Sequence, residues 1–403
     1  MLNINDVKNA HKRIENVVYN TPMTYAPILS QKSGYDVYLK KENLQITGAF
    51  KLRGAFNAIA SLVESKKIEG IVAASAGNHA QGVAYSAKHF NINATIIMPD
   101  STPLTKVQGV RDLGATVILN GSNYDEAYAY AKKFAKDRGY DFVHPFEDDT
   151  VIAGQGTIAL EILEEVDNLD AIIVPVGGGG LISGIAKVAK YINPNIKIIG
   201  VASAGASAMK NSYDKKTPID SLSVRTIADG IAVRDTSPIT LNYILDSVDN
   251  MTLVEEEEIA YAILFLLEKQ KVLVEGAGAV GVAGLLHNKI DLPKDSKIAI
   301  VLSGGNIDVT MLSLIIEKGL VKSSRKMKLQ VTLIDKPGSL KLFTQLLEEV
   351  GANIVQIGYD RTSTDLRFGD ANVSVALETK GEEHQDRIRD ILIRNEFKFR
   401  EEY

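Results

Sequence analysis

The chain contains four consecutive glycines, Gly177, Gly178, Gly179 and Gly180, between the apolar run Ala171–Val176 and a helix-like stretch, Leu181–Lys190. Because glycine has no Cβ, successive backbone N–H groups in such a run can converge on one point. A strand, a loop of this kind and a helix N-terminus together make a phosphate-binding arrangement. The run therefore predicts a phosphorylated cofactor or substrate; the alternative is a flexible strand-to-helix turn.

The loop matches neither common nucleotide-binding motif. Ile182 and Ser183 stand where the dinucleotide pattern G-x-G-x-x-G requires glycine, and the Gly-Lys-Ser/Thr of a Walker loop is absent. The commonest explanation of a glycine-rich phosphate loop is thereby removed.

Composition excludes several other classes of function. A net charge of −5 argues against nucleic acid as the main partner. The absence of cysteine excludes disulfides, thiolate metal sites and cysteine nucleophiles. The N-terminus lacks a signal-peptide pattern, and no apolar run approaches the roughly 20 residues of a membrane span. We therefore expect a cytoplasmic protein without a membrane anchor.

From about residue 36 to 320, strand-like runs alternate with helical patterns such as Tyr124–Arg138 and Gly156–Val166. This rhythm is typical of an α/β fold with parallel sheets, where ligands bind at the carboxyl ends of strands. We expect each candidate motif to lie after a strand or in a loop. The predicted strands are Ile71–Ala74, Ala94–Met98, Thr116–Leu119, Ala171–Val176, Ile198–Val201 and Lys297–Leu302.

A short polar segment, 321–327, reads as a linker to a separate unit, 328–403. In this unit the turn Asp335–Ser339 contains a proline with preset φ and a permissive glycine. The order βαββαβ is the ferredoxin-like plan. The expected elements are strands Lys328–Ile334, Asn353–Tyr359, Asn372–Glu378 and Lys398–Tyr403, and helices Leu340–Val350 and Glu382–Asn395.

Four further segments contain residues suited to chemistry. Lys51 is flanked by Phe50 and Leu52, and partial desolvation there would favour its neutral amine. Ser75–Gly82 follows a strand, and its amides are suited to binding a carboxylate at a helix start. Ser303–Asn306 and Glu275–Ala279 are by themselves better read as plain glycine turns. Most lysines are solvated surface charges, so no single segment is specific.

Taken together and in this order, these segments resemble the fold type II pyridoxal-phosphate enzymes, specifically the threonine/serine dehydratase group, over roughly residues 5–320. The C-terminal unit resembles an ACT domain. The resemblance implies a two-lobed catalytic domain like that of the tryptophan synthase β subunit in residues 1–320, with a smaller lobe of roughly residues 43–155. It also implies an ACT regulatory domain in residues 328–403.

The resemblance also implies a role for individual residues. Lys51 would form the Schiff base with pyridoxal 5'-phosphate and remove the Cα proton of the substrate. Phe50 would pack against the pyridine ring, Asn78 would bond its hydroxyl, and Ser303 would face its nitrogen. The four glycines would hold the phosphate. Residues expected around the substrate are Ser75, Gly77, Asn78 and His79 at its carboxylate, and Pro145, Phe146, Ala153, Gly154 and Gln155 near its side chain.

The implied activity is β-elimination of L-threonine to 2-oxobutanoate and ammonia, and also of L-serine to pyruvate. A serine dehydratase or racemase is the alternative, although related racemases carry a second serine where this chain has Ala76. A non-catalytic amino-acid sensor is a remote third reading. Ala202 and Ala208 replace the carboxylates of metal-binding relatives, so we expect no divalent metal site of that type. Ala49 and the segment Arg234–Ser237 depart from the pattern of the group with effects left open.

For the C-terminal unit, the resemblance implies allosteric regulation by an amino acid within a homo-oligomer, a dimer or tetramer. Isoleucine or valine is the expected effector, as in isoleucine biosynthesis, with inhibition or activation and a biosynthetic or catabolic role left open. Oligomerisation without a ligand is the alternative. The residues expected to bind the effector are Asp335, Pro337, Gly338, Ser339 and Leu340.

Overall fold

The chain divides into two compact units, Met1–Asp308 and Val309–Tyr403, in a computed structural model that describes residues 2–364 and 366–402. The expected boundary at residue 320 lies inside helix α13 (Val309–Lys322), which belongs to the second unit. The expected linker, 321–327, is helical at its start and enters strand β11 (Lys326–Ile334) at its end. An ion pair of 2.5 Å between Glu317 and Lys326 ties the helix to that strand.

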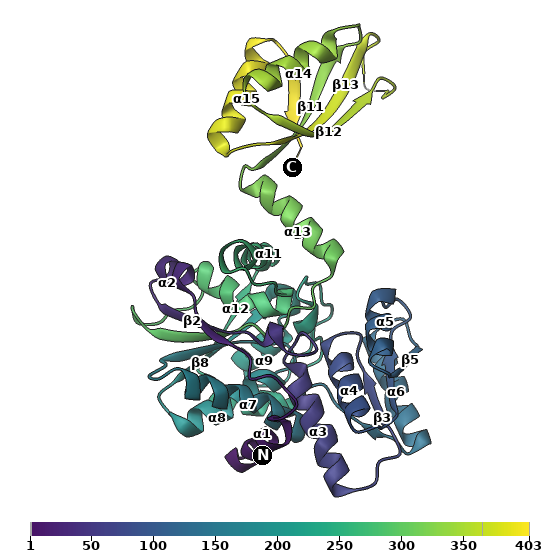
Figure 1. The fold of residues 1–403 in the computed structure, drawn as a ribbon, viewed down its shortest axis with the longest axis vertical. Helices are drawn as coiled ribbons and strands as arrows, with labels where there is room; N and C mark the ends of the chain where they lie inside the picture. The colour runs from purple at the N-terminus through teal and green to yellow at the C-terminus, as the bar shows by residue number, and fades with distance from the viewer. Residues whose placement is uncertain (1, 365, 403) are drawn as a thin grey trace. The chain divides into compact units, whose positions relative to one another are not determined.

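The larger lobe of the first unit is built on a six-stranded sheet. Its elements are α1 (Ile4–Ile14), β1 (Met23–Tyr25), α2 (Pro27–Ser33), β2 (Asp36–Lys40), η1 (Glu42–Leu44), α7 (Asp149–Glu165), β7 (Ala171–Pro175), α8 (Gly180–Ile192), β8 (Lys197–Ser203), η2 (Ala204–Ala206), α9 (Ala208–Lys215), η3 (Asp229–Ile231), α10 (Pro238–Ser247), β9 (Asn250–Val254), α11 (Glu256–Phe265), η4 (Leu266–Gln270), α12 (Gly276–Leu286) and β10 (Lys297–Val301). The strand order is β1-β2-β10-β7-β8-β9, and only β1 is antiparallel to its neighbour. Helix α12 covers one face, and α7 and α8 cover the other (Figure 1). Burial of both faces explains why the central strands are continuous apolar runs.

The smaller lobe contains a parallel four-stranded sheet. Its elements are α3 (Lys51–Ser65), β3 (Ile71–Ala74), α4 (Asn78–His89), β4 (Ala94–Met98), α5 (Leu104–Asp112), β5 (Thr116–Leu119), α6 (Tyr124–Arg138) and β6 (Asp141–Phe142). The strand order is β5-β4-β3-β6. Side chains alternate along β3: Ile71 and Ala73 pack with α3, α4 and α5, whereas Val72 and Ala74 pack with α6. Both faces are therefore covered by helices.

The second unit forms an antiparallel sheet covered by two helices. After α13 and β11 its elements are α14 (Ser339–Glu349), β12 (Asn353–Asp360), β13 (Asp370–Glu378), α15 (Glu382–Arg394) and β14 (Lys398–Glu401). The strand order β12-β13-β11-β14 and the chain order βαββαβ match the expected ferredoxin-like plan. Phe343 and Ile388 of the helices pack on alternate residues of β11, such as Leu329. Tyr403, the end of the last expected strand, lies outside the described residues.

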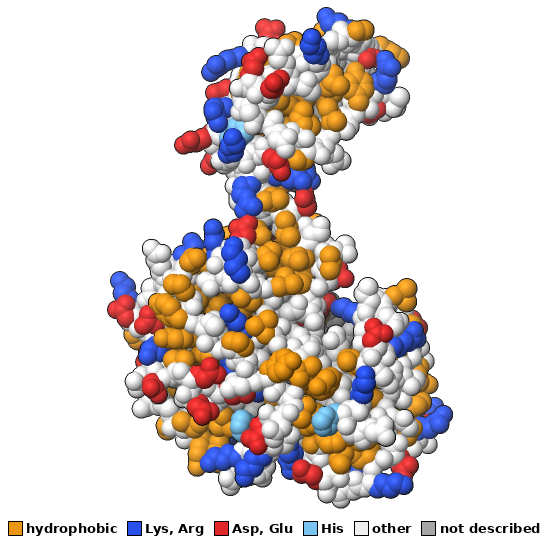
Figure 2. Space-filling model, viewed as in Figure 1, with side chains coloured by type: hydrophobic (Ala, Val, Ile, Leu, Met, Phe, Trp, Pro, Cys, Tyr) orange, Lys and Arg blue, Asp and Glu red, His pale blue; other side chains and the backbone are white. Residues whose placement is uncertain are grey.

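The surface carries charges of both signs. Blue and red side chains are interspersed on the visible face of Figure 2, in agreement with the small net charge of −5. Within residues 2–364 and 366–402, no helix has the length and apolar character needed to cross a membrane.

Candidate active site

The four glycines form the turn between β7 and α8 at the carboxyl edge of the larger sheet. Cβ atoms placed on them would lie 2.5–2.9 Å from atoms of three flanking residues, Phe146, Ile231 and Thr240. Gly179 also has a φ of +89°, which side chains rarely adopt. Side chains are therefore excluded by close packing on every side, which does not fit the alternative of a flexible turn.

The first backbone amides of α8 do not take part in hydrogen bonds within the helix. The first hydrogen bond of α8 runs from Ser183 N to Gly179 O at 3.0 Å. N–H groups before this point have no partner within the helix and are suited to an anion. The Thr240 hydroxyl donates to Gly178 O at 2.8 Å and anchors the loop to α10.

Lys51 begins α3 and is half-buried. Its Nζ donates to Pro145 O at 3.2 Å and lies 5.5 Å from the centre of the Phe50 ring. Burial lowers the pKa of Lys51 to about 8, and the charge of Glu275 opposes the shift. A lower pKa increases the fraction of neutral amine, the form that acts as nucleophile and base.

The segment after β10 places Ser303 next to Phe50, the residue before Lys51. Phe50 N donates to Ser303 O at 3.1 Å, and Ala49 forms an isolated antiparallel bridge with Gly304. Ser303 is buried. Segments more than 200 residues apart in the sequence thus meet at one point, as the rule on strand ends predicts.

A buried carboxylate, Glu275, links the asparagines of the site. Asn78 Nδ2 donates to Glu275 Oε1 at 2.8 Å, and Asn306 Nδ2 donates to Asn78 Oδ1 at 2.8 Å. Burial raises the pKa of Glu275 to about 7, against the bond from Asn78. A Cβ on Gly304 would lie 2.5 Å from Glu275 Oε1, so the glycine leaves room for this carboxylate. Sequence reasoning named the segment but assigned no role to Glu275.

The segment after β3 supplies a helix start and a neutral imidazole. Gly77 N donates to Ser75 Oγ at 3.2 Å, and α4 begins at Asn78. His79 Nε2 lies 2.9 Å from Val143 O, so Nε2 carries the proton. Burial, followed by the charge of Lys51, lowers the pKa of His79 to about 3. Its Nδ1 is buried and has no hydrogen-bond partner among the described residues.

Ala153 and Gly154 were expected to lie outside the helix predicted from Gly156, but they lie within a helix. They belong to α7, which begins at Asp149 rather than at Gly156 because Asp148 caps it by accepting from Thr150 N at 2.7 Å. A Cβ on Gly154 would lie 2.5 Å from Arg53 O. Gly154 thus permits the close approach of α3 and α7, and its contact with substrate stays a prediction.

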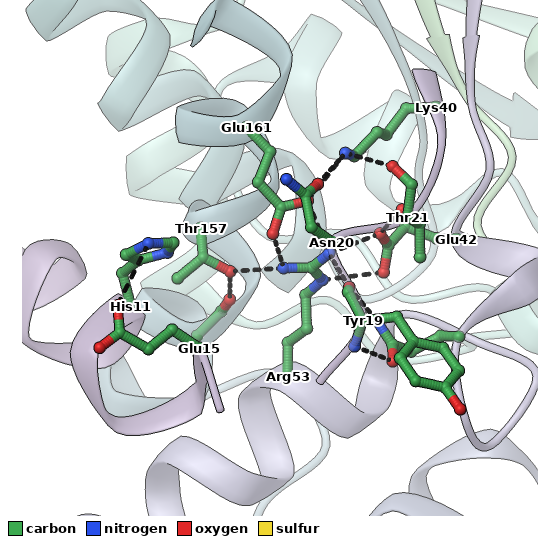
Figure 3. Close-up of polar contacts among 12 residues, drawn as sticks. His11, Glu15, Tyr19, Asn20, Thr21, Lys40, Glu42, Arg53, Thr157 and Glu161 are labelled. Atoms are coloured by element: carbon green, nitrogen blue, oxygen red, sulfur yellow. Dashed lines mark hydrogen bonds and ion pairs between the residues drawn. The ribbon is translucent and has the colours of Figure 1, made fainter. Parts of the chain in front are cut away.

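A buried ion cluster supports the helix that carries Lys51. Arg53, two residues after Lys51 in α3, pairs with Glu42 of η1 at 2.8 Å and Glu161 of α7 at 2.5 Å. Lys40 of β2 also pairs with Glu161, at 2.8 Å. Figure 3 shows Arg53 between the two carboxylates, with the Tyr19 carbonyl and the Thr157 hydroxyl as further acceptors. Sequence reasoning missed this cluster entirely.

The segment Arg234–Ser237, which departs from the pattern of the group, has structural roles. Arg234 pairs with Asp125 of α6 at 2.8 Å, which joins the two lobes at the surface. The Ser237 hydroxyl caps α10 by accepting from Ile239 N and Thr240 N at 3.1 and 3.3 Å. This cap supports the helix whose Thr240 anchors the glycine loop.

Residues 14–304 match the family described as pyridoxal-phosphate dependent enzyme. The chain belongs to this family. It is 48% identical over 400 residues to an L-threonine ammonia-lyase of Thermotoga maritima, covering 99% of both chains. Among solved structures, maize serine racemase is similar with a TM-score of 0.75 and 36% identity over 80% of this chain and 98% of that chain. The processed form of threonine deaminase isoform 2 from Solanum lycopersicum gives a TM-score of 0.73 and 36% identity over 78% and 88%. The predicted fold type II is confirmed.

The residues of this family member fit its cofactor. The glycine loop leaves no room for side chains and offers amides to a phosphate, and the half-buried Lys51 supplies an amine with a lowered pKa. His79 Nδ1, which has no hydrogen-bond partner among the described residues, is a further acceptor. It lies close enough to Lys51 for the Lys51 charge to lower the pKa of His79. The individual roles assigned to Phe50, Asn78 and Ser303 stay predictions.

The turn expected to bind an effector lies in the second unit, between β11 and α14. Asp335 accepts a hydrogen bond from Tyr359 Oη at 3.0 Å and is paired with Arg361. These bonds hold the pKa of Asp335 below its usual value. Gly338 has a φ of +96° and precedes Ser339, the first residue of α14. Tyr359 and Arg361 were not among the predicted residues, because they lie on another strand and the loop after it.

Proposed function

We propose that this chain is a threonine ammonia-lyase that converts L-threonine to 2-oxobutanoate and ammonia, and L-serine to pyruvate. The observation that carries the proposal is the 48% identity to an L-threonine ammonia-lyase over 99% of both chains. The cluster of Lys51, Glu275 and the glycine loop supports the proposal, because it gathers the groups that the reaction requires.

In this proposal the chain's own residues bind, orient and move a proton. Bound pyridoxal phosphate would supply a conjugated ring that withdraws electrons from the substrate Cα. The glycine loop would hold its phosphate, and Asn78 and Ser303 would fix the ring. The Lys51 amine would then accept the Cα proton, and its lowered pKa keeps part of it neutral near neutral pH. The amides at the start of α4 would hold the substrate carboxylate.

The test of the proposal is the release of 2-oxobutanoate by the purified enzyme loaded with pyridoxal phosphate. We expect equal amounts of 2-oxobutanoate and ammonia, and a kcat/KM for L-threonine about 10-fold or more above that for L-serine. One methyl group in a pocket provides roughly 1–3 kcal/mol of discrimination. Absence of 2-oxoacid from both amino acids would refute the assignment.

Serine racemase is the second candidate, because the maize enzyme of that name shares the fold at 36% identity. Ala76 weighs against it, since the side chain has no group that can donate a proton to the substrate from the other side. We expect less than about 1% conversion of L-serine to D-serine relative to pyruvate formation, measured by chiral chromatography. An Ala76→Ser variant is the matched comparison, and faster D-serine formation by the unsubstituted enzyme would favour the racemase.

We further propose that the second unit is an ACT domain that binds isoleucine or valine and joins chains into a cytoplasmic homo-oligomer. Figure 2 shows apolar side chains on the visible face of this unit, and the exposed residues of β12 include Val355, Ile357 and Tyr359. These residues lie on a strand that the helices leave largely uncovered, which suits pairing with a second copy. The Asp335 turn would bind the effector, in keeping with a role in isoleucine biosynthesis.

We expect saturating isoleucine or valine to change the kcat/KM for threonine by about fivefold or more, the usual size of allosteric coupling. Asp335→Ala should remove the response without changing the basal rate. Lys380→Ala, an exposed substitution on the same unit, is the control and should keep the response. If it also loses the response, the loss in Asp335→Ala does not locate the effector at the Asp335 turn. If neither amino acid alters activity or the melting temperature, sensing is excluded and only oligomerisation remains for this unit.

A further inference from the structure

His144 lies in the segment between β6 and α7 and makes an unusual set of contacts. Its Nδ1 accepts hydrogen bonds from Phe146 N at 3.3 Å and Glu147 N at 2.8 Å. Its Nε2 lies 3.2 Å from a carboxylate oxygen of Glu147. An acceptor that receives amides two and three residues ahead is typical of Asn and Asp in tight turns. Here an imidazole has that role.

The protonation state of His144 agrees with these contacts. Burial lowers the pKa of His144 to about 4, the charge of Glu147 opposes the shift, and the positive charge of Lys51 adds to the effect of burial. The ring is therefore neutral near neutral pH. Because Nδ1 receives two N–H donors, the proton sits on Nε2, which faces Glu147.

The segment held by His144 contacts both halves of the candidate site. Pro145 O accepts from Lys51 Nζ at 3.2 Å. Phe146 fills the space beside the glycine loop, since Cβ atoms on Gly178 and Gly180 would lie 2.5 and 2.9 Å from it. The Phe146 ring meets the His144 ring edge-on, at 4.8 Å between centres. The segment that bonds to the His144 ring therefore provides two contacts of the site, the Pro145 carbonyl at Lys51 and the Phe146 side chain at the glycine loop.

We infer that His144 is a positioning residue for the reaction. By accepting the amides of Phe146 and Glu147, it holds the Pro145 carbonyl at Lys51 and Phe146 against the glycine loop. Without the acceptor, this segment would loosen, and both cofactor affinity and turnover would fall. The inference rests on the proposed roles of Lys51 and of the glycine loop.

Two substitutions separate the acceptor from the ring. Asn places Oδ1 the same number of bonds from Cα as Nδ1 of histidine, so His144→Asn keeps the acceptor and loses the ring. His144→Phe keeps an aromatic ring against Phe146 and loses the acceptor. We expect His144→Asn to keep kcat and the Kd for pyridoxal phosphate within about threefold, because it replaces both hydrogen bonds. We expect His144→Phe to lose at least about tenfold in each, because two amides are left unpaired.

The measurements are titration of the apoenzyme with pyridoxal phosphate and kcat at saturating cofactor. The same two substitutions at His89, an exposed residue at the end of α4, are the matched controls and should change neither quantity. Retention by His144→Phe, or equal losses in both His144 variants, would overturn the inference. A chain that releases no 2-oxobutanoate would refute the proposed function instead, while the titration still tests His144.

Discussion

Lys51→Ala is expected to lower the rate of 2-oxobutanoate release by at least about 10⁴-fold, the upper range for loss of a general base. Lys51 supplies the neutral amine that would accept the Cα proton. Burial lowers its pKa to about 8, and no second lysine is described in contact with Pro145 or Phe50. The measurement is single-turnover and steady-state release of 2-oxoacid from L-threonine.

Lys51→Arg tests whether charge alone is sufficient. Arginine keeps the positive charge but does not lose its proton in proteins, so it provides neither base nor nucleophile. We therefore expect it to be as inactive as Lys51→Ala. Lys67→Ala, on an 88% exposed side chain, is the control and should keep full activity. More than about 1% residual turnover in a folded Lys51→Ala enzyme would remove Lys51 from its assigned role.

The strands of the first unit were predictable because a strand buried on both faces of a sheet is a continuous apolar run in the sequence. Ile71–Ala74 and Ala94–Met98 are continuous apolar runs, and the strands β3 and β4 have these bounds. The start of α7 was not predictable in the same way. The helical pattern was predicted to begin at Gly156, which left Gly154 outside it, whereas α7 begins at Asp149 and Gly154 permits its close contact with α3.

The partners of the site residues were also beyond local reasoning. Glu275 stands among glycines and small residues, and nothing in that segment indicates that its carboxyl is buried and bonded to Asn78. Such a contact depends on which strand ends become neighbours, a property of the whole sheet. Glu275 is the N-cap residue of α12 in the larger lobe and Asn78 begins α4 of the smaller lobe, so the contact joins two lobes and no local pattern indicates it. Tertiary context decides the state of such a group, and the raised pKa of Glu275 is one result.

Arg53→Ala is expected to lower the free energy of unfolding by about 3–5 kcal/mol, the cost of breaking a buried ion pair by removing one partner. The guanidinium is fully buried and donates to both carboxylates, at 2.5–2.9 Å. Its removal leaves Glu42 and Glu161 without their main counter-charge, although Lys40 still reaches Glu161. The measurement is the midpoint of urea unfolding at pH 7.

A partly exposed arginine, Arg13, and a conservative substitution of Arg53 make this prediction specific. Arg13→Ala removes a pair with Glu64, whose side chain is 56% exposed, and a hydrogen bond to Asn57 Oδ1 at 3.2 Å, and should cost only about 1 kcal/mol. Arg53→Lys keeps the charge but loses the planar fork that bonds two carboxylates at once, so its stability should lie between those of the native chain and Arg53→Ala. Because α3 begins at Lys51, a loosened cluster should also weaken cofactor binding in Arg53→Lys and leave it intact in Arg13→Ala. Equal stability of Arg53→Ala and Arg13→Ala would show that the cluster does not fix the helix that carries Lys51.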